Sequence, residues 1–308
     1  MNVKKIVSLF SGCGGLDYGF INNKKYIHVL SNDIDKDACL TYENNYKIKP
    51  LCCDIKLLTD IPNCDLLIGG FPCQGFSIAN INRNEKDVRN NLYIEILRIL
   101  NLKKPSYFIL ENVKGILSMG GYENNIDKKN KTGKIMKLIL SELINCGYKV
   151  SFKLFNLKKF NIPQNRERVI IFGIRNDVQF NIQYPKECDN VVTLKDAIGD
   201  ISIEYDEKIQ HIGTKHKCTI SNYIGNRELR WDEPSPTITG RGGGTGGPVI
   251  HNHPSLKRRL SVRECARIQT FPDSFIFTGS ITSMYRQIGN AVPCKFSEIL
   301  AKVFEDAP

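Results

Sequence analysis

The sequence contains no apolar run of about 18 residues, the length that a transmembrane helix requires. Its first twelve residues, MNVKKIVSLFSG, lack the long apolar stretch and the cleavage site of a secretory signal peptide. These two absences argue against a membrane protein and against a secreted one. We therefore expect a soluble protein that is not exported and that has no membrane partner.

Histidine is scarce, and no two cysteines have the CxxC spacing of many metal and redox sites. Of the five histidines, only His251 and His253 stand close together, and a surface turn explains that pair better than a metal site does. We predict no metal, zinc included. The 11 cysteines are diluted in a long chain without a signal peptide, so we expect free thiols rather than a disulfide framework.

The composition that is present indicates a folded, basic protein. A chain of 308 residues with 41% hydrophobic residues can fill the core of one large domain or of two smaller ones. Its 43 Lys and Arg exceed its 32 Asp and Glu by 11, and the pI is about 9.1. This charge favours a polyanionic partner such as nucleic acid, although solubility alone could account for it.

Short apolar runs alternate with helical patterns in the first half of the chain. Strands are predicted over residues 3–10, 26–31, 65–70 and 106–110. Helices are predicted after the glycine-rich turn at 11–15 and over about 35–45, 91–100 and 134–146. In the last helix, Ile135, Leu138, Ile139 and Leu143 are expected on one buried face. Near-continuous apolar strands are typical of a parallel sheet covered on both sides, so we predict an α/β fold.

The second half of the chain has a different character. Strands over 148–156 and 169–174 are joined by a polar loop too short for a helical crossover, which predicts an antiparallel pair. Residues 176–259 are charged and Asn-rich with few apolar runs, and they predict a second, smaller unit. Helical periodicity returns over 261–271 and 293–305, with Pro293 in a first turn, and these helices could close the first domain.

The first candidate site is the turn after the first strand, because open α/β sheets bind ligands at the carboxyl ends of their strands. Its glycines would let a ligand approach the backbone, and Asp33 follows about twenty residues later. This resembles a nucleotide site, but Asp17 stands where the third glycine of the dinucleotide motif belongs. An anionic side chain there disfavours pyrophosphate, so S-adenosylmethionine fits better than NAD. A plain glycine turn is an equally good explanation.

A thiol, a carboxyl group and two arginines are expected at the same edge of the sheet. Cys73 and Glu111 each follow a predicted strand, and Arg166 and Arg168 share one face if the segment before 169 is extended. Each has a simpler explanation: Cys73 could be a buried thiol, Glu111 could form a structural salt bridge, and the two arginines could belong to an exposed hairpin. Together, the four favour nucleophilic catalysis with methyl transfer. A thiolate that adds to carbon 6 of a pyrimidine activates carbon 5, and a group near ring nitrogen 3 stabilises the adduct.

Six segments, taken in order, resemble the DNA (cytosine-5) methyltransferase family, in particular its small bacterial type II restriction-modification members. They are SLFSGCGGLDYGF, GGFPCQGFS, ENVKG, PQNRERVIIFGIR, RRLSVRECARIQTFPDSF and YRQIGNAVP. The resemblance covers most of the chain outside 176–259 and implies a Rossmann-like S-adenosylmethionine-dependent methyltransferase sheet with a smaller, irregular target-recognition domain. The implied division is a catalytic and cofactor-binding domain (1–185), a target-recognition domain (186–259) and a C-terminal segment that returns to the first domain (260–308).

The resemblance also implies roles for individual residues. Cys73 would add covalently to a flipped-out cytosine, Glu111 would contact and help to protonate ring nitrogen 3, and Arg166 and Arg168 would orient the base and lower the pKa of the thiol. S-adenosylmethionine is the implied methyl donor and S-adenosylhomocysteine the product. The residues implied to line the cofactor pocket are Phe10, Gly12, Gly14, Leu16, Asp33, Ile34, Asp54, Ile55, Leu92, Asn290 and Val292. Two positions depart from the family pattern: Cys13 stands where alanine is commoner, and Ile34 stands where an aromatic often stacks on adenine.

Duplex DNA is the implied partner. The segment NRELRWDEPSPTITGRGGG resembles the recognition segment of small bacterial members that read G/C-containing sites. The residues implied to contact DNA are Gln74, Ser77, Arg83, Arg89, Gln164, Arg227, Arg230, Thr237 and Arg241. Arg227, Arg230 and Arg241 are the candidates for reading guanine, with phosphate contact or plain solvation as the alternative. The resemblance further implies a cytoplasmic, DNA-associated bacterial monomer, with or without a cognate restriction endonuclease.

Three other functions compete with this one. One branch of the same family methylates tRNA with the same catalytic residues, but the basic segment after 176 favours duplex DNA. A DNA-binding module with an inactive enzyme fold is disfavoured because Cys73, Glu111, Arg166 and Arg168 are all present. A cysteine hydrolase would need a histidine base near Cys73, and four of the five histidines lie beyond residue 210.

Overall fold

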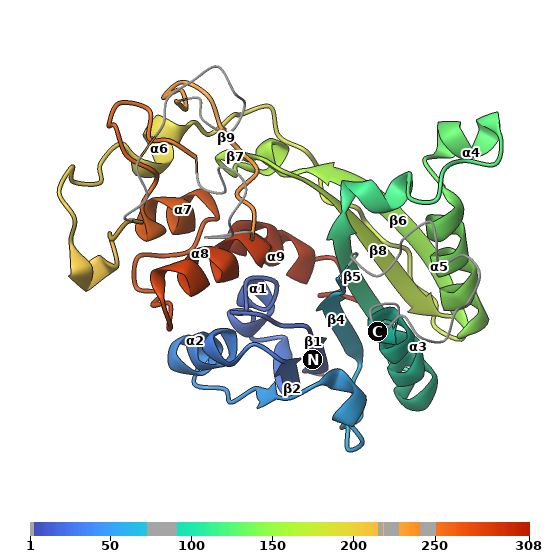
Figure 1. The fold of residues 1–308 in the computed structure, drawn as a ribbon. Coiled ribbons are helices and arrows are strands. Elements are labelled where there is room, and N and C mark those ends of the chain that lie inside the picture. The colour runs from blue at the N-terminus through green and yellow to red at the C-terminus, as the bar shows by residue number, and fades with distance from the viewer. Residues whose placement is uncertain (1–2, 73–90, 215–217, 219–227, 241–250) are drawn as a thin grey trace.

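A seven-stranded sheet forms the centre of the larger part of the protein (Figure 1). The structure, a computed structural model, describes residues 3–72, 91–214, 218, 228–240 and 251–308. In sheet order the strands are β3 (Leu51–Cys52), β2 (Tyr26–Asp33), β1 (Lys4–Leu9), β4 (Leu66–Gly70), β5 (Tyr107–Val113), β8 (Glu167–Arg175) and β6 (Tyr148–Asn156). The first five pair in parallel, whereas β8 is antiparallel to both β5 and β6. The predicted α/β sheet and antiparallel pair are confirmed.

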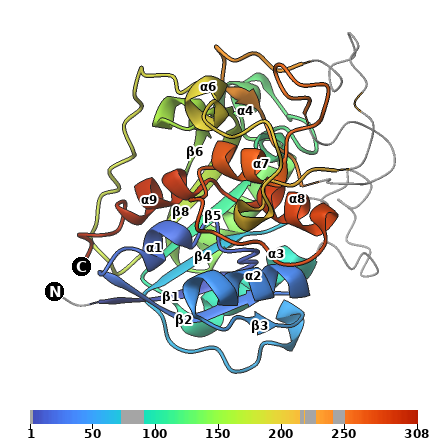
Figure 2. The same cartoon turned by 90° about the vertical axis from the view of Figure 1, so that its left-hand side faces the viewer.

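Helices cover both faces of the sheet (Figures 1 and 2). The α-helices are α1 (Tyr18–Ile21), α2 (Lys36–Tyr46), α3 (Asn91–Lys103), α4 (Asn125–Asn130), α5 (Lys134–Asn145), α6 (Leu194–Ile198), α7 (Val262–Ile268), α8 (Ile281–Asn290) and α9 (Cys294–Ala301). Short 3₁₀ helices are η1 (Ile55–Leu57), η4 (Lys114–Leu117), η5 (Leu157–Phe160) and η6 (Glu207–Ile209). On one face Ile96 of α3 joins Leu67 in a buried cluster, and on the other Phe296 of α9 joins Ile68.

The buried face of α5 differs from the predicted one at one position. Ile135, Ile139 and Leu143 are buried as predicted, but Leu138 is 44% exposed and Met136 is buried in its place. Positions i, i+1, i+4 and i+8 form one stripe on a helix, and Leu138 falls beside that stripe. The prediction for Leu138 is therefore wrong.

The last helix returns to the first domain, as its periodicity predicted. Gly19 N donates 2.8 Å to Ser297 Oγ, and Tyr26 OH donates 2.6 Å to the carbonyl of Ala301. A side chain on Gly19 would collide with the α9 backbone at Ser297 and Glu298, so α1 and α9 pack in direct contact. Pro293 is the N-cap of α9 rather than a first-turn residue.

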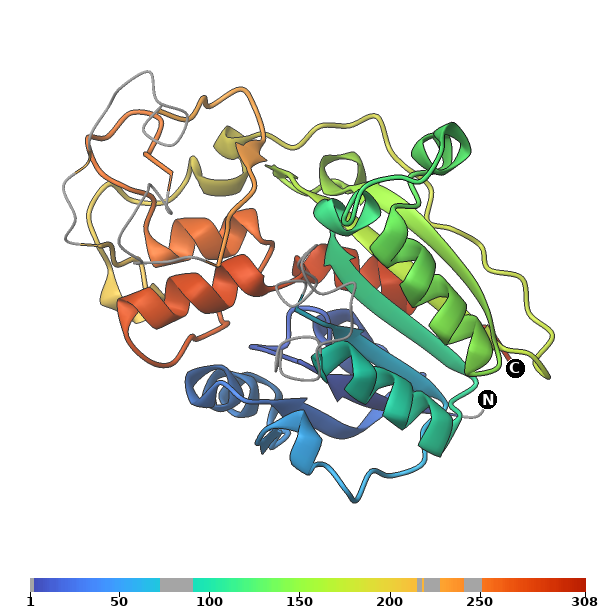
Figure 3. The same ribbon diagram turned by 45° about the vertical axis from the view of Figure 1, so that its right-hand side comes forward.

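A smaller unit stands beside the sheet and is built around α6, α7 and α8 (Figures 1 and 3). Its buried cluster joins Leu194 and Ile238 to Leu260, Phe271 and Ile288. The short parallel pair of β7 (Gln164–Asn165) and β9 (Ser235–Pro236) connects it to the segment before β8. Helices α7 and α8 therefore pack within this unit, and α9 alone of the C-terminal helices packs on the sheet. The predicted boundaries at 186 and 260 remain predictions.

Helix α8 was not predicted. It buries Ser283, Gln287 and Gly289 together with apolar residues, so its buried face carries a mixed pattern that hides the helical period. Within the described ranges, the structure holds no helix that is both long and apolar enough to span a membrane.

Candidate active site

The carboxyl end of β4 lies directly beside Glu111. Gly70, the last residue of β4, is the register partner of Glu111 in β5. A Cβ on Gly70 would lie 3.1 Å from Glu111 Oε2, so the glycine leaves room for the carboxylate over this strand end. Asn112 Nδ2 donates 3.1 Å to the carbonyl of Phe71 and holds the backbone that leads to residue 73. Cys73 itself lies outside the described residues.

Glu111 and Arg168 form an ion pair at this edge. The antiparallel register sets Arg168 opposite Val113, two residues beyond Glu111 on the same face of the sheet. Arg168 Nε lies 2.7 Å from Glu111 Oε1, and the two side chains are 11% and 13% exposed. Each charge satisfies the other where few water molecules reach them. The predicted placement of Glu111 and Arg168 at one edge is confirmed.

Arg166 does not share that surface, and the predicted arginine pair is wrong. Its side chain is 1% exposed, and its terminal nitrogens donate to the carbonyls of Ile238 at 2.7 Å and of Gly289 and Ala291 at 3.0 Å each. The two-residue period fails because Arg166 lies between β7 and β8, where its N–H bonds back to Gln164. Burial and the like charge of Arg168 lower the pKa of Arg166. Arg166 therefore joins its own segment to the backbone at Ile238 and to the backbone at the end of α8, and it does not face a ligand.

Gln164 was predicted to contact DNA, and that prediction is also wrong. The residue is fully buried, with Nε2 donating 2.7 Å to Gln269 Oε1 and Oε1 accepting from Ile238 N at 3.0 Å. Gln269 Nε2 in turn donates to the carbonyls of Ile288 and Ala291. Sequence reasoning missed both Gln269 and Asn112. In the sequence, each could be noticed only as a polar residue within a segment that was expected to be buried.

The glycine-rich turn after β1 is ordered around Asp33. Its Oδ2 accepts from Gly12 N at 2.8 Å and its Oδ1 from Asp35 N at 2.9 Å, and burial raises its pKa. Gly12 has φ +55, and a side chain there would meet no atom within 4 Å. The side chain of Ile34 is 69% exposed. Open space beside an oriented carboxylate and an exposed apolar side chain fits a ligand with ribose hydroxyls and an apolar base.

Other predicted pocket residues have different surroundings. Leu16, Ile55 and Val292 are at most 7% exposed and pack in the two sheet clusters, so their side chains do not line an open pocket, contrary to the prediction. A side chain on Gly14 would collide with Tyr46, whose OH donates 2.7 Å to the Gly14 carbonyl. Of the remaining four, Phe10 and Leu92 are partly buried, Asp54 caps η1, and Asn290 is exposed beside Gly240.

Asp17 does not face the cofactor side, so its charge cannot exclude pyrophosphate as the sequence suggested. The residue is fully buried, and its Oδ1 accepts from Tyr42 OH at 2.9 Å and lies 3.4 Å from His28 Nδ1. Burial raises the pKa of Asp17 to about 7 and lowers that of His28 to about 4. Asp17 is therefore part of the support beneath the turn rather than of the ligand surface.

This burial predicts a pH-dependent stability. The folded protein holds a proton on Asp17 from about pH 4 to 7 that the unfolded chain releases, so this carboxyl destabilises the fold increasingly as pH rises through that window. In the natural protein, Asp17 should lower the unfolding free energy by about 1.4 kcal/mol for each pH unit in this window. The Asp17→Asn variant should not show this decrease. Because the lowered pKa of His28 has the opposite effect, the informative quantity is the variant's unfolding free energy minus that of the natural protein, from pH 4.5 to 8.

That difference should rise with pH and level off above pH 7. Asp60→Asn, at an exposed position, is the matched control and should show no such rise. A flat difference for Asp17→Asn would show that the carboxyl titrates normally.

The smaller unit holds part of the predicted DNA-contacting set. Arg230 is exposed and paired with Asp232 at 2.9 Å, and Thr237 is half-buried with Oγ1 donating to the Asn165 carbonyl. The residues of the set that lie outside the described ranges are Gln74, Ser77, Arg83, Arg89, Arg227 and Arg241.

The histidine pair does not form a joint site. His251 Nε2 lies 3.2 Å from the carbonyl of Thr237, and His253 Nδ1 accepts from two backbone N–H groups. His253 is only 6% exposed, so the predicted surface turn is wrong for it. The described residues contain no group of three or more His, Cys, Asp or Glu placed to hold a metal ion.

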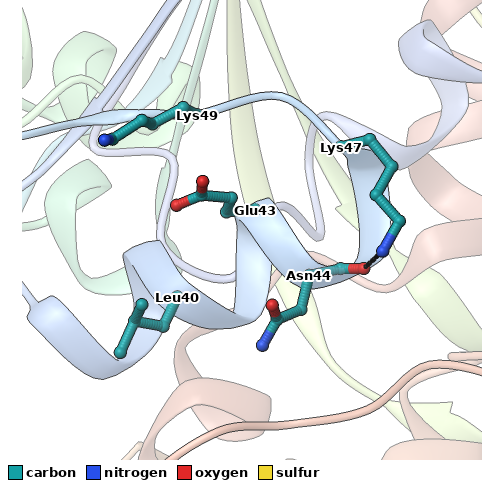
Figure 4. A pocket seen from close by; sticks show the side chains of 5 residues that line it. All are labelled: Leu40, Glu43, Asn44, Lys47 and Lys49. Atoms are coloured by element: carbon teal, nitrogen blue, oxygen red, sulfur yellow. Dashed lines mark hydrogen bonds between the residues drawn. The ribbon is translucent and has the colours of Figure 1, made fainter.

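A hollow lies along α2 and is lined by Leu40, Glu43, Asn44, Lys47 and Lys49 (Figure 4). Lys47 is the C-cap of α2, whereas Asp33 and Ile34 precede the N-terminus of that helix. The hollow is therefore separate from the turn around Asp33. The described residues that line it include neither a cysteine nor an arginine.

Comparison with known proteins decides the family. The sequence model described as C-5 cytosine-specific DNA methylase matches residues 4–306. The chain belongs to this family. It is 35% identical to the Type II methyltransferase M.BsuRI of Bacillus subtilis over 96% of this chain and 78% of that protein. It is 36% identical to the Type II methyltransferase M.NgoFVII of Neisseria gonorrhoeae over 98% of this chain and 86% of that protein.

Solved structures show the same fold. A DNA modification methyltransferase encoded within an E. coli prophage superposes with a TM-score of 0.75 at 23% identity, covering 98% of this chain and 99% of that one. The Dnmt2 methyltransferase of S. pombe gives a TM-score of 0.70 at 21% identity and covers 98% of each chain. The chain is thus a DNA (cytosine-5) methyltransferase with a Rossmann-like sheet, and family and fold imply S-adenosylmethionine as its cofactor.

Proposed function

We propose that this methyltransferase modifies carbon 5 of a cytosine within one short duplex DNA sequence, as the protective methylase of a restriction-modification system. The relatives named Type II methyltransferases support the restriction-modification role. The observation that carries the chemistry is the Glu111–Arg168 ion pair beside the strand end from which the chain leads to Cys73. A cognate endonuclease for the same site, a monomeric enzyme and a cytoplasmic location belong to this proposal.

In the proposed mechanism the Cys73 thiolate forms a bond to carbon 6 of the cytosine. The electron pair of the carbon 5–carbon 6 double bond then makes carbon 5 the nucleophile for the methyl group that S-adenosylmethionine would supply, with S-adenosylhomocysteine as the leaving group. Glu111 relays a proton from solvent to ring nitrogen 3 as negative charge develops there. Loss of the carbon 5 proton to water, departure of the Cys73 thiolate and return of the ring nitrogen 3 proton to Glu111 then regenerate the double bond and free the enzyme. A base stacked in a duplex cannot present carbon 6 to a thiol, so the mechanism requires that the cytosine leave the helix.

In this mechanism, Arg168 positions the Glu111 carboxylate and the base. Its ion pair holds the Glu111 carboxylate on one face of the sheet, and its remaining N–H groups can orient the oxygen of the base. Arg166 has no direct part, because its terminal N–H groups are bonded to backbone carbonyls.

S-adenosylmethionine supplies the electrophilic methyl group when bound. The residues proposed to hold it are Asp33, for the ribose hydroxyls, and the exposed Ile34, for the adenine, with the backbone of Gly12 at the open side of the turn. Phe10, Gly14, Asp54, Leu92 and Asn290 would complete the surroundings. Two positions depart from the family pattern, the buried Cys13 and the exposed Ile34. Neither is one of the proposed catalytic residues.

Residues 186–259 are proposed to recognise the target sequence. Arg227, Arg230 and Arg241 are the candidates for contacts with guanine. To contact a guanine, the exposed Arg230 would have to give up its ion pair with Asp232. The other residues proposed to contact DNA are Gln74, Ser77, Arg83, Arg89 and Thr237. The first domain, 1–185, and the segment 260–308 would then hold the cofactor and the catalytic residues.

The test is transfer of labelled methyl groups from S-adenosylmethionine to unmethylated duplex DNA and, in parallel, to tRNA. The proposal predicts that transfer to DNA greatly exceeds transfer to tRNA and that the labelled product is 5-methylcytosine. The opposite ratio would assign the chain to the tRNA-modifying branch of the family.

A further inference from the structure

A short helical projection stands near the same end of the sheet as the Glu111–Arg168 pair. Strand β5, which contains Glu111, runs directly into η4, and α4 follows before the chain enters α5. In Figures 1 and 3, α4 projects beyond the end of α5 at the periphery of the molecule. We call residues 123–134 the lysine spur.

The charges of the lysine spur are segregated. Its acidic residues, Glu123 and Asp127, both face Lys137 of α5, whose Nζ lies 2.9 Å from the first and 2.5 Å from the second. Its lysines have no ion-pair partner within the described part of the chain, and all are exposed: Lys128, Lys129, Lys131 and Lys134. The acids therefore hold the base of the spur, while four positive charges remain toward solvent.

The spur is held in one position relative to the catalytic edge. Gly133 N donates 2.8 Å to the carbonyl of Leu117, and Lys134 N donates 3.0 Å to that of Gly121. A Cβ on Gly133 would lie 3.0 Å from the Leu117 carbonyl oxygen, so a side chain there would push against the backbone of η4. Asn124 caps α4 by accepting from Asp127 N at 2.9 Å. The lysines thus lie on an anchored support that follows the β5 strand of Glu111 and η4 in the chain.

The geometry points to the lysine spur as a second DNA-binding surface, one that contacts phosphates of the duplex outside the methylated sequence. This inference rests on the proposed DNA substrate. Lysine ammonium groups suit phosphate contacts because they need no fixed geometry, and such contacts position a protein without reading sequence. Solubility alone would not require that both acids pair with Lys137 while the four lysines stay exposed, without an ion-pair partner in the described part of the chain.

The inference predicts a change in the salt dependence of binding. For each phosphate contact, the slope of log K against log salt concentration steepens by about 0.9. The full-length triple variant Lys128→Gln, Lys129→Gln, Lys131→Gln should therefore bind a long duplex with a slope that is shallower by about 2 to 3. A duplex trimmed to the methylated site should bind the variant and the natural enzyme with equal slopes.

A matched variant controls for net charge. Lys24→Gln, Lys47→Gln, Lys49→Gln removes three exposed lysines, of which Lys47 and Lys49 line the hollow of Figure 4 and Lys24 lies between α1 and β2. It should leave the slope on the long duplex unchanged. In the spur variant the methylated sequence and kcat at saturating DNA should stay as they are, which also verifies its fold.

Three results would overturn the inference. They are an unchanged slope in the spur variant, an equal change in both triple variants, and an equal change on long and trimmed duplexes. Methyl transfer to DNA by the natural enzyme is measured separately. Its absence would overturn the proposed function, whereas normal methylation with an unchanged slope would overturn only the role of the spur.

Discussion

Cys73→Ser is expected to abolish methyl transfer while binding of duplex DNA survives. A serine hydroxyl is far less acidic than a thiol, so no nucleophile forms to attack carbon 6. Loss of the nucleophile costs on the order of 10⁶-fold in kcat in enzymes that act as a covalent catalytic unit. DNA is held mainly by phosphate contacts at other residues, so its affinity should change little. Single-turnover methylation and gel-shift binding measure the two quantities.

Cys188→Ser is the control for this substitution. The Cys188 thiol donates to the carbonyl of Lys159 at 3.1 Å, a bond that a serine hydroxyl can also make. The Cys188→Ser variant should therefore keep full methyl-transfer activity. Turnover by Cys73→Ser at the natural rate would refute the assignment of the nucleophile.

Glu111→Gln is expected to lower kcat by about 10²- to 10⁴-fold, the usual contribution of a positioned acid or base. The amide keeps the size of the side chain but can neither carry the negative charge nor pass a proton to ring nitrogen 3. It also leaves Arg168 without its ion-pair partner at an edge where both side chains are at most 13% exposed, so some loss of thermal stability should accompany the loss of activity.

The neighbouring carboxylate supplies the matched control. Glu167 is paired with Lys114 at 2.7 Å on the same strand as Arg168, and it is more exposed than Glu111. Glu167→Gln should therefore change kcat little. Comparison of kcat at saturating DNA with the melting temperature separates chemistry from folding. A Glu111→Gln variant that is destabilised yet retains kcat would reduce Glu111 to a structural partner of Arg168.

The sheet could be predicted because its signal is local. Strands β4 and β5 are buried on both faces, so each reads as a continuous apolar run, and Glu111 stands out as a carboxylate at the end of such a run. The short loop between β6 and β8 indicates only that these two strands pair antiparallel. The pairing of β5 with β8, which brings Glu111 to Arg168, was not predicted.

The errors arose where distant segments meet. Gln164 and Arg166 appeared to be surface residues because their partners Ile238 and Gly289 lie more than seventy residues away. Asp17 appeared to face a ligand because nothing local revealed Tyr42 beside it. Buried polar side chains are bonded to whichever segment the fold brings to them, and sequence spacing does not contain that information.

The proposed function is tested first by base-resolution mapping of 5-methylcytosine in unmethylated genomic DNA after incubation with the purified protein and S-adenosylmethionine. We expect 5-methylcytosine at one short sequence, on both strands, and none with the Cys73→Ser variant. Unmodified DNA from an enzyme that still binds S-adenosylmethionine would contradict it.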